Sequence, residues 1–250
     1  MSDVPKLRDG GHAHPQELYP LGMIPADVVT ALCGDIVYLA GTGRSDMTGN
    51  DFGDAFANAI GGEHFGSPVG IADVGLGEHA WSAKTVKINN PLDAKNVRLI
   101  SGRNSPDYSF GVQDPHKDVQ KTGDMVLKIW NERINIALGR FRILRTIVLL
   151  RNSSLTNFAL FEEDIHQVSP ADYTWKTNEH GNFVAEHRLT GKTSFTWQPH
   201  GSQFTMHVEV PAGAIRFSLQ RPTALDKKSF LLNLHYDKSW IHVFNSKKSS

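Results

Sequence analysis

The strongest constraint on the fold is a pair of strand-like runs joined by only three residues. Residues 69–76 (VGIADVGL) and residues 80–88 (AWSAKTVKI) flank the tripeptide GEH at 77–79. Val, Ile, Thr and Trp favour strands, and a connection this short joins neighbouring antiparallel strands. The segment therefore predicts a β-hairpin.

The segments around this hairpin alternate between helical and strand patterns. Apolar residues recur at helical spacing from about 51 to 60, and Asn50 or Asp51 is expected to cap that helix. Further helices are predicted at 25–32 and 123–138, and further strands at 97–101, 145–150 and 157–162. This order of elements predicts an α+β fold with a mixed sheet.

After residue 166 the sequence becomes rich in β-formers and aromatic residues. Trp175, Trp197 and Trp240 are expected to fill the core of this part. The predicted strands are 183–187, 193–197, 204–210, 215–219, 230–236 and 240–244. We expect an N-terminal arm (1–20), a core (21–165) and a β-rich C-terminal part (166–250) packed on the core as one unit.

Composition narrows the class of protein. The 250 residues are 40% hydrophobic and 21% charged, which is enough apolar material for a buried core and excludes disorder over most of the chain. The only cysteine, Cys33, excludes a disulfide scaffold and is expected to be a core thiol. No apolar run approaches the roughly 20 residues of a membrane span, and the N-terminus lacks a signal pattern. We therefore expect a cytoplasmic protein with no membrane partner.

The zero net charge hides an uneven distribution of charge. Residues 1–82 hold eleven acidic and three basic side chains. Five Lys or Arg and one Asp lie within 84–105, and seven Lys or Arg and two acidic residues lie within 121–151. A basic surface beside an acidic pocket suits a polyanionic substrate, although solvated helix and strand faces explain the same pattern.

The hairpin also carries the residues with the clearest chemistry. Ser82 and Lys84 share one face of the second strand, and Asp73 on the first strand can meet Lys84 across the hairpin. The Asp73 carboxylate and the carbonyl oxygen of Ala83 are hard oxygen ligands of the type that Mg²⁺ prefers. Lys84 is expected to orient the attacking water for phosphodiester hydrolysis. A simple surface Asp–Lys pair is the alternative.

An Asp on one strand followed by acidic-x-Lys on the next resembles the PD-(D/E)XK nucleases. The preceding helix (NDFGDAFANAIGG) and the later runs VRLISGRNSPDYSFG and RTIVLLRNSSLTNFALFEED resemble type II restriction endonucleases. The resemblance covers about residues 45–165. It implies a mixed sheet flanked by helices and Mg²⁺-dependent cleavage of double-stranded DNA.

Two positions depart from the pattern of that superfamily. Ala72 precedes Asp73 where a proline is usual, and Ser82 stands where the second acid is expected, so the motif is D-x8-S-A-K. The resemblance implies a displaced acid, for which Asp54, Glu78 and Glu63 are candidates, and we favour Asp54. Catalysis is thus assigned to Asp73, Lys84, Ser82 and Asp54, and metal binding to Asp73, Asp54 and Ala83.

A polar loop follows the third predicted strand. Its side chains are expected to reach phosphates or base edges, although a plain polar loop explains them equally well. The residues assigned to DNA binding are Arg103, Asn104, Ser105, Tyr108 and Lys87. A second acidic-Lys spacing, Asp114 to Lys117, is one residue too long and contains a proline, so we reject it as the catalytic motif. His12 and His14 are a weak candidate metal pair.

The resemblance therefore implies a site-specific endonuclease of restriction type, a Mg²⁺-dependent type II deoxyribonuclease. A palindromic target cut on both strands implies two active sites and hence a homodimer. Two alternatives stay open. One is a nicking or repair endonuclease with the same core, and the other is a non-catalytic β-rich binding module.

Overall fold

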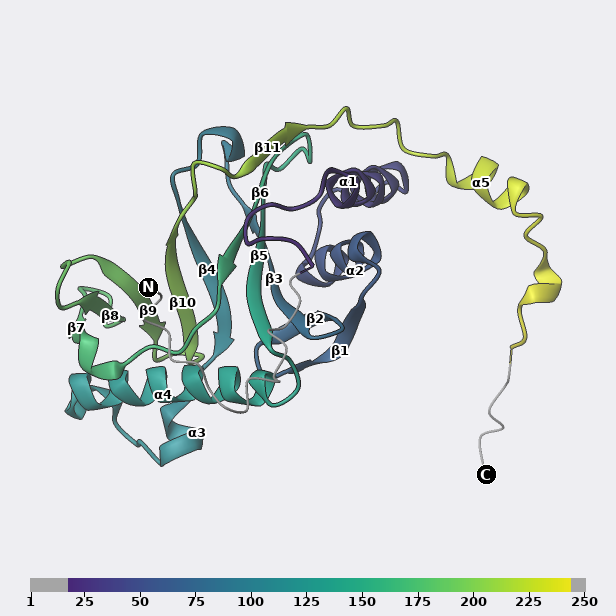
Figure 1. Cartoon of the computed structure of the whole chain (residues 1–250). Helices are drawn as coiled ribbons and strands as arrows, with labels where there is room; N and C mark the ends of the chain where they lie inside the picture. The colour runs from purple at the N-terminus through teal and green to yellow at the C-terminus, as the bar shows by residue number, and fades with distance from the viewer. Residues whose placement is uncertain (1–17, 244–250) are drawn as a thin grey trace, which may run out of the picture.

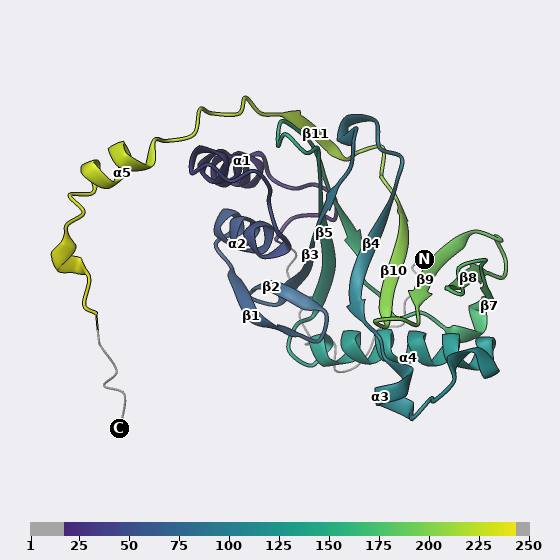
Figure 2. The same ribbon diagram turned by 180° about the vertical axis from the view of Figure 1, so that it is seen from behind.

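The computed structural model describes residues 18–243, which form two packed sheets and five α-helices. Figures 1 and 2 show three layers: a pair of helices, a first sheet, and a second sheet on the opposite side. A long helix runs beneath both sheets. The predicted α+β class with a mixed sheet is confirmed. The N-terminal arm lies almost wholly outside the described residues, and so do His12 and His14.

The first sheet has six strands in the order β1-β2-β3-β5-β6-β11. Only the β3–β5 pairing is parallel, and every other pairing is antiparallel. The strands are β1 (Glu63–Val69), β2 (Ala72–Leu76), β3 (His79–Lys87), β5 (Ile143–Arg151), β6 (Asn157–Asp164) and β11 (Ile215–Ser218). The hairpin predicted from the sequence is β2–β3 and is confirmed.

The second sheet has five antiparallel strands in the order β4-β10-β9-β8-β7. They are β4 (Asn96–Arg103), β10 (Gln203–Glu209), β9 (Thr193–Gln198), β8 (Phe183–His187) and β7 (Tyr173–Thr177). The two sheets do not divide at the expected boundary between residues 165 and 166, because each contains one strand from the other side of it. β4 joins the C-terminal sheet, and β11 joins the first sheet.

Helices α1 (Ala26–Gly41) and α2 (Gly49–Ile60) cover one face of the first sheet (Figures 1 and 2). The cap of α2 is Thr48, whose side chain accepts from the Asp51 backbone in a capping box, so neither Asn50 nor Asp51 is the cap. Gly61 ends the helix in the left-handed conformation. The other helices are α3 (Pro106–Phe110), α4 (Val119–Leu138) and α5 (Lys227–Asn233).

The two faces of the first sheet carry different cores. Val74, Trp81 and Ala83 pack with α1 and α2 in one apolar cluster. The opposite face packs against α4 and the second sheet in two further clusters. Because side chains alternate along a strand, this division settles which face each hairpin residue occupies. Between residues 18 and 243, no helix is long and apolar enough to cross a membrane.

Several sequence predictions about the C-terminal part are wrong. The apolar run 230–236 lies largely in α5, because Asp226 caps a helix there by accepting from the Ser229 backbone. Residues 238–240 form a 3-10 turn, and no strand follows it up to residue 243. Trp240 is 59% exposed, so it fills no core. Strands β1 and β7 were not predicted.

Candidate active site

The site begins where the two strands of the hairpin separate. The ladder between β2 and β3 includes Val74 opposite Trp81 and does not continue to Asp73. At that point the Ala83 backbone N–H donates to Asp73 Oδ2 at 3.0 Å. The carboxylate thus takes the place of a missing ladder partner, which satisfies a backbone donor that is otherwise left open.

The same carboxylate oxygen receives two side chains of β3. Ser82 Oγ donates to Asp73 Oδ2 at 3.2 Å, and Lys84 Nζ donates to it at 3.1 Å. The Asp73 and Lys84 side chains are 21% and 19% exposed. In the described part of the chain, no hydrogen bond ends on Asp73 Oδ1. The predicted meeting of Asp73, Ser82 and Lys84 is therefore present, and one carboxylate oxygen remains for a ligand.

The carbonyl oxygen of Ala83 is directed toward the same place. The N–H and C=O of one strand residue point to the same neighbouring strand. Because the Ala83 N–H meets Asp73, its carbonyl also faces the gap between β2 and β3. A carboxylate oxygen of β2 and a carbonyl oxygen of β3 then lie on facing sides of the point where the two strands separate.

Arg133 on α4 is a component of the site that the sequence did not reveal. Its guanidinium donates to the Ser101 carbonyl and to Asn104 Oδ1. Burial lowers the pKa of Arg133, and the nearby negative charge of Asp73 opposes that change. The positive charge of Arg133 therefore acts on the Asp73 carboxylate in addition to that of Lys84, although Arg133 lies 49 residues after Lys84 in the chain.

Gly102 allows the Arg133 guanidinium to approach β4 closely. Its φ is +94°, a backbone conformation that side-chain-bearing residues rarely adopt. A Cβ at this position would lie 3.0 Å from both terminal nitrogens of Arg133. Glycine is thus required both by the backbone and by the contact.

Asp54 does not join this group. It lies on α2, is 68% exposed and pairs with His64 Nδ1 at 2.7 Å. Because α2 packs on the face that carries Val74 and Trp81, Asp54 is on the other side of the sheet from Lys84. Its assignment as a metal ligand is therefore corrected to that of a surface ion pair.

The other two candidates for the displaced acid also lack contact with Asp73. Glu78 lies in the hairpin turn and pairs with Arg142 at 3.1 Å. Glu63 begins β1 opposite Gly75 and is exposed. Among residues 18–243, no group of three or more His, Cys, Asp or Glu side chains could hold a metal ion. The site therefore offers one carboxylate and one carbonyl.

The residues predicted to contact DNA have different positions. Arg103 and Tyr108 are exposed, and Tyr108 is 93% so. Lys87 is exposed and pairs with Asp46 at 2.7 Å. Ser105 caps α3 by accepting from the Tyr108 backbone. The rejected segment 114–117 is a 3-10 turn and not a strand, as expected.

Asn104 requires a correction. Its side chain is fully buried, and its amide donates to the Val126 carbonyl at 3.1 Å. Its backbone carbonyl accepts from Trp197 Nε1 at 2.8 Å. A residue enclosed in this way joins β4, α4 and β9 and does not read DNA in this conformation.

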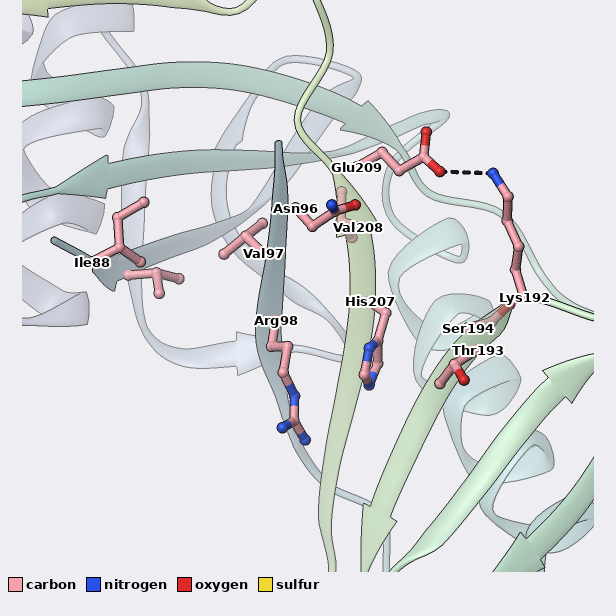
Figure 3. A pocket seen from close by; sticks show the side chains of 11 residues that line it. Ile88, Asn96, Val97, Arg98, Lys192, Thr193, Ser194, His207, Val208 and Glu209 are labelled. Atoms are coloured by element: carbon pink, nitrogen blue, oxygen red, sulfur yellow. Dashed lines mark hydrogen bonds and ion pairs between the residues drawn. The ribbon is translucent and has the colours of Figure 1, made fainter. Parts of the chain in front are cut away.

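A separate hollow of about 640 Å³ lies at the second sheet. Figure 3 shows Arg98 and His207 on β4 and β10, with the Lys192–Glu209 ion pair (2.8 Å) at the rim. Burial and the charge of Arg98 lower the pKa of His207, and its Nε2 lies 2.6 Å from Thr196 Oγ1. None of the residues of the Asp73 group lines this hollow.

No protein-family model, no curated protein and no solved structure matches the chain. Any assignment of function therefore rests on the residues of the chain and their geometry. Of the arrangements described above, only the group of Asp73, Ser82, Lys84 and Arg133 combines an available carboxylate oxygen with two nearby cations.

Proposed function

We propose that the protein is a Mg²⁺-dependent endonuclease that hydrolyses phosphodiester bonds of double-stranded DNA. The observation that carries the proposal is the meeting of Asp73 and Lys84 at the point where β2 and β3 separate. The carboxylate, the Ala83 backbone N–H and the ammonium group of the order D-x8-S-A-K meet through hydrogen bonds on one carboxylate oxygen. A restriction-endonuclease-like core is part of the proposal, supported by the mixed sheet with helices against both faces.

The oxygen ligands present fit Mg²⁺. This ion keeps several waters and is commonly held by one or two carboxylates together with substrate phosphate oxygens. Asp73 Oδ1 and the Ala83 carbonyl would hold it, and Ser82 Oγ would hold one of its waters. When bound, Mg²⁺ supplies acidification of water and neutralisation of phosphate charge.

The side chains of the protein then have separate tasks. Lys84 orients the attacking water in line with the phosphorus–oxygen bond that breaks. Arg133 offsets the negative charge that grows on the phosphate, since a fixed cation in a partly buried site acts strongly there. As the oxygen of the attacking water bonds to phosphorus and its proton passes to solvent, the bond from phosphorus to the 3′ oxygen breaks. The leaving 3′ oxygen takes a proton from water, and the product is a cut strand with a 5′ phosphate and a 3′ hydroxyl.

The test is cleavage of supercoiled plasmid and unmethylated phage DNA with millimolar Mg²⁺ or with EDTA. Discrete fragments are expected with Mg²⁺ only, and Asp73→Asn and Lys84→Ala are expected to abolish them. The matched control is Lys192→Ala, which breaks an exposed Lys–Glu pair on the second sheet and is expected to cut normally.

Each outcome of this assay has a definite meaning. Linear products support a double-strand cutter, and nicked circles alone support the nicking alternative. Intact DNA across several substrates with Mg²⁺ and Mn²⁺, or equal cutting by the Asp73→Asn variant, would overturn the proposal. The first of these results would favour the non-catalytic binding module.

A further inference from the structure

The C-terminal arm, residues 220–243, exposes an unusual amount of apolar surface. Eight of its large apolar side chains are more than 40% exposed: Leu225, Phe230, Leu232, Leu234, Tyr236, Trp240, Ile241 and Val243. Large exposed apolar areas are rare on soluble monomers and mark interaction surfaces. The arm therefore has the composition of a docking segment.

The base of the arm is fixed to the body. The Leu225 N–H donates to the carbonyl of Gly41, the last residue of α1, at 2.8 Å. Arg221 donates to the carbonyls of Ser154 (3.1 Å) and Arg44 (2.9 Å). These contacts set the direction in which the chain leaves the molecule.

Beyond Leu225, the arm is folded but makes only local hydrogen bonds. Asp226 caps α5, and Asp237 caps the turn Lys238–Trp240. The hydrogen bonds described for residues 226–243 all end within that same segment. Figures 1 and 2 both show α5 and the residues after it running clear of the body.

The face formed by α1 and α2 is complementary to the arm. A shallow groove between these helices is lined by Asp35, Asp51 and Asp54 together with Tyr38. Tyr38 is 66% exposed, and the adjacent Val37 is 37% exposed. Asp51 is held by Arg44 and Asp54 is bonded to His64, so Asp35 is the groove carboxylate for which the described residues supply no ion pair. The face thus combines acidic side chains with exposed apolar surface.

The arm presents the opposite charge. It carries Lys227, Lys228 and Lys238 against Asp226 and Asp237, whose carboxylates accept hydrogen bonds from backbone N–H groups, so its Lys and Asp side chains leave an excess of one positive charge. Opposite charges around an apolar centre steer two surfaces together and fix their orientation. The arm and the α1–α2 face therefore match in both charge and hydrophobicity.

We propose that the arm of one molecule docks on the α1–α2 face of a second copy of the chain, and that the two copies exchange arms. The chain passes the end of α1 heading outward, and α5 begins two residues after the Leu225 anchor. In the structure, α5 and the residues after it run clear of the α1–α2 face of their own molecule (Figures 1 and 2), so both surfaces are left for a second copy. Reciprocal exchange closes a two-fold dimer in which both arms are covered.

The direct test is the molar mass of the full chain by light scattering at micromolar concentration. The wild-type protein is expected at twice 27.7 kDa. Phe230→Asp with Leu234→Asp is expected at 27.7 kDa, and the control Leu189→Asp, at an exposed turn of the second sheet, is expected to stay dimeric. This readout does not depend on cleavage of DNA, so it is separable from the proposed function.

A charge-swap experiment identifies the two surfaces. One variant carries Lys227→Glu and Lys228→Glu in the arm, and the other carries Asp35→Lys and Asp54→Lys on the face. Each variant alone is expected to be monomeric, because like charges then meet, and their mixture is expected to form the heterodimer. A monomeric wild-type protein, or a dimer that neither set of substitutions weakens, would overturn the proposal.

Discussion

Among the described residues, two ion pairs join neighbouring strands of the first sheet, one on each face, and the two pairs differ in their access to solvent. Glu162 and Arg145 face α1 and α2 with side chains 0% and 2% exposed. Asp73 and Lys84 face the second sheet with side chains 21% and 19% exposed. The first pair is sealed from water, and the second remains open to a ligand.

The hydrogen bonds of the two carboxylates differ in the same way. Glu162 receives Tyr19 Oη at 2.9 Å and Trp81 Nε1 at 2.8 Å on one oxygen, and Gly22 N and Arg145 on the other. Asp73 receives three donors on Oδ2 alone. A carboxylate with both oxygens occupied holds a fold together, whereas one with an available oxygen can bind a metal.

The largest expected effect is on the cleavage rate and concerns the face of the first sheet that carries Asp73 and Lys84. Lys84→Ala should lower the cleavage rate about 10²–10⁴-fold, the usual contribution of a group that handles the proton or nucleophile. Its free energy of unfolding should change by no more than about 1 kcal/mol, as for other pairs reached by solvent. Single-turnover cleavage measures the change in rate, and urea unfolding of the same preparation measures the change in stability. A large loss of stability would make Lys84 structural.

Glu162→Ala should produce the largest loss of stability. It removes a buried carboxylate that pairs with Arg145 and leaves the Tyr19 hydroxyl and Trp81 Nε1 without this acceptor, which costs roughly 3–5 kcal/mol. Urea unfolding followed by Trp fluorescence measures the change. Glu163→Ala, one residue along and on the opposite face, is the matched control and should change stability far less.

Gly102→Ala should have a smaller effect with two parts. Backbone strain at a positive φ costs about 1–3 kcal/mol, and the added methyl group displaces Arg133. Gly201→Ala is the control, because Gly201 has φ +84° with no atom within 4 Å of the added Cβ. Both variants should lose stability, but only Gly102→Ala should also slow cleavage. Equal cleavage by the two would remove Arg133 from the site.

The smallest effect concerns pH and Glu163, which faces the same side as Asp73. Burial raises the pKa of Glu163 above its ordinary value of 4.5. The stability that this group contributes is present below pH 4.5 and is lost as the pH rises through the raised pKa. Glu163→Gln should therefore match wild-type stability at pH 4 and exceed it slightly at pH 7. Thermal unfolding across that range, with Glu179→Gln as an exposed control, is the measurement.

Much of this open face could be predicted from the sequence because it is local. Alternation along 69–76 and 80–88 identified the hairpin, and strand geometry alone brought Asp73 to Lys84. The contributions that were missed come from distant segments. Arg133 approaches from α4, and Asn104 is buried by α4 and β9, which no pattern within a single segment reveals.

The C-terminal part shows a second limit of sequence patterns. The apolar run 230–236 is compatible with a strand or a helix when read alone. The Asp226 cap and the absence of a partner strand within the described residues favour the helix. The prediction for Trp240 failed for a related reason. An aromatic residue favours burial, but its presence in the sequence does not show which surface, if any, buries it.

The position of β4 in the second sheet also has a consequence for synthesis of the chain. Arg98 on β4 pairs with His207 on β10, and β4 has no other strand partner in the described structure. At translation rates of about 5–20 residues per second, the intervening stretch of roughly 100 residues takes about 5–20 s to emerge. During this time the backbone N–H and C=O groups of β4 have no strand to pair with, so another chain could pair with them. The nascent chain is most exposed to aggregation during this interval, and a slow final step that assembles the second sheet follows from the same topology.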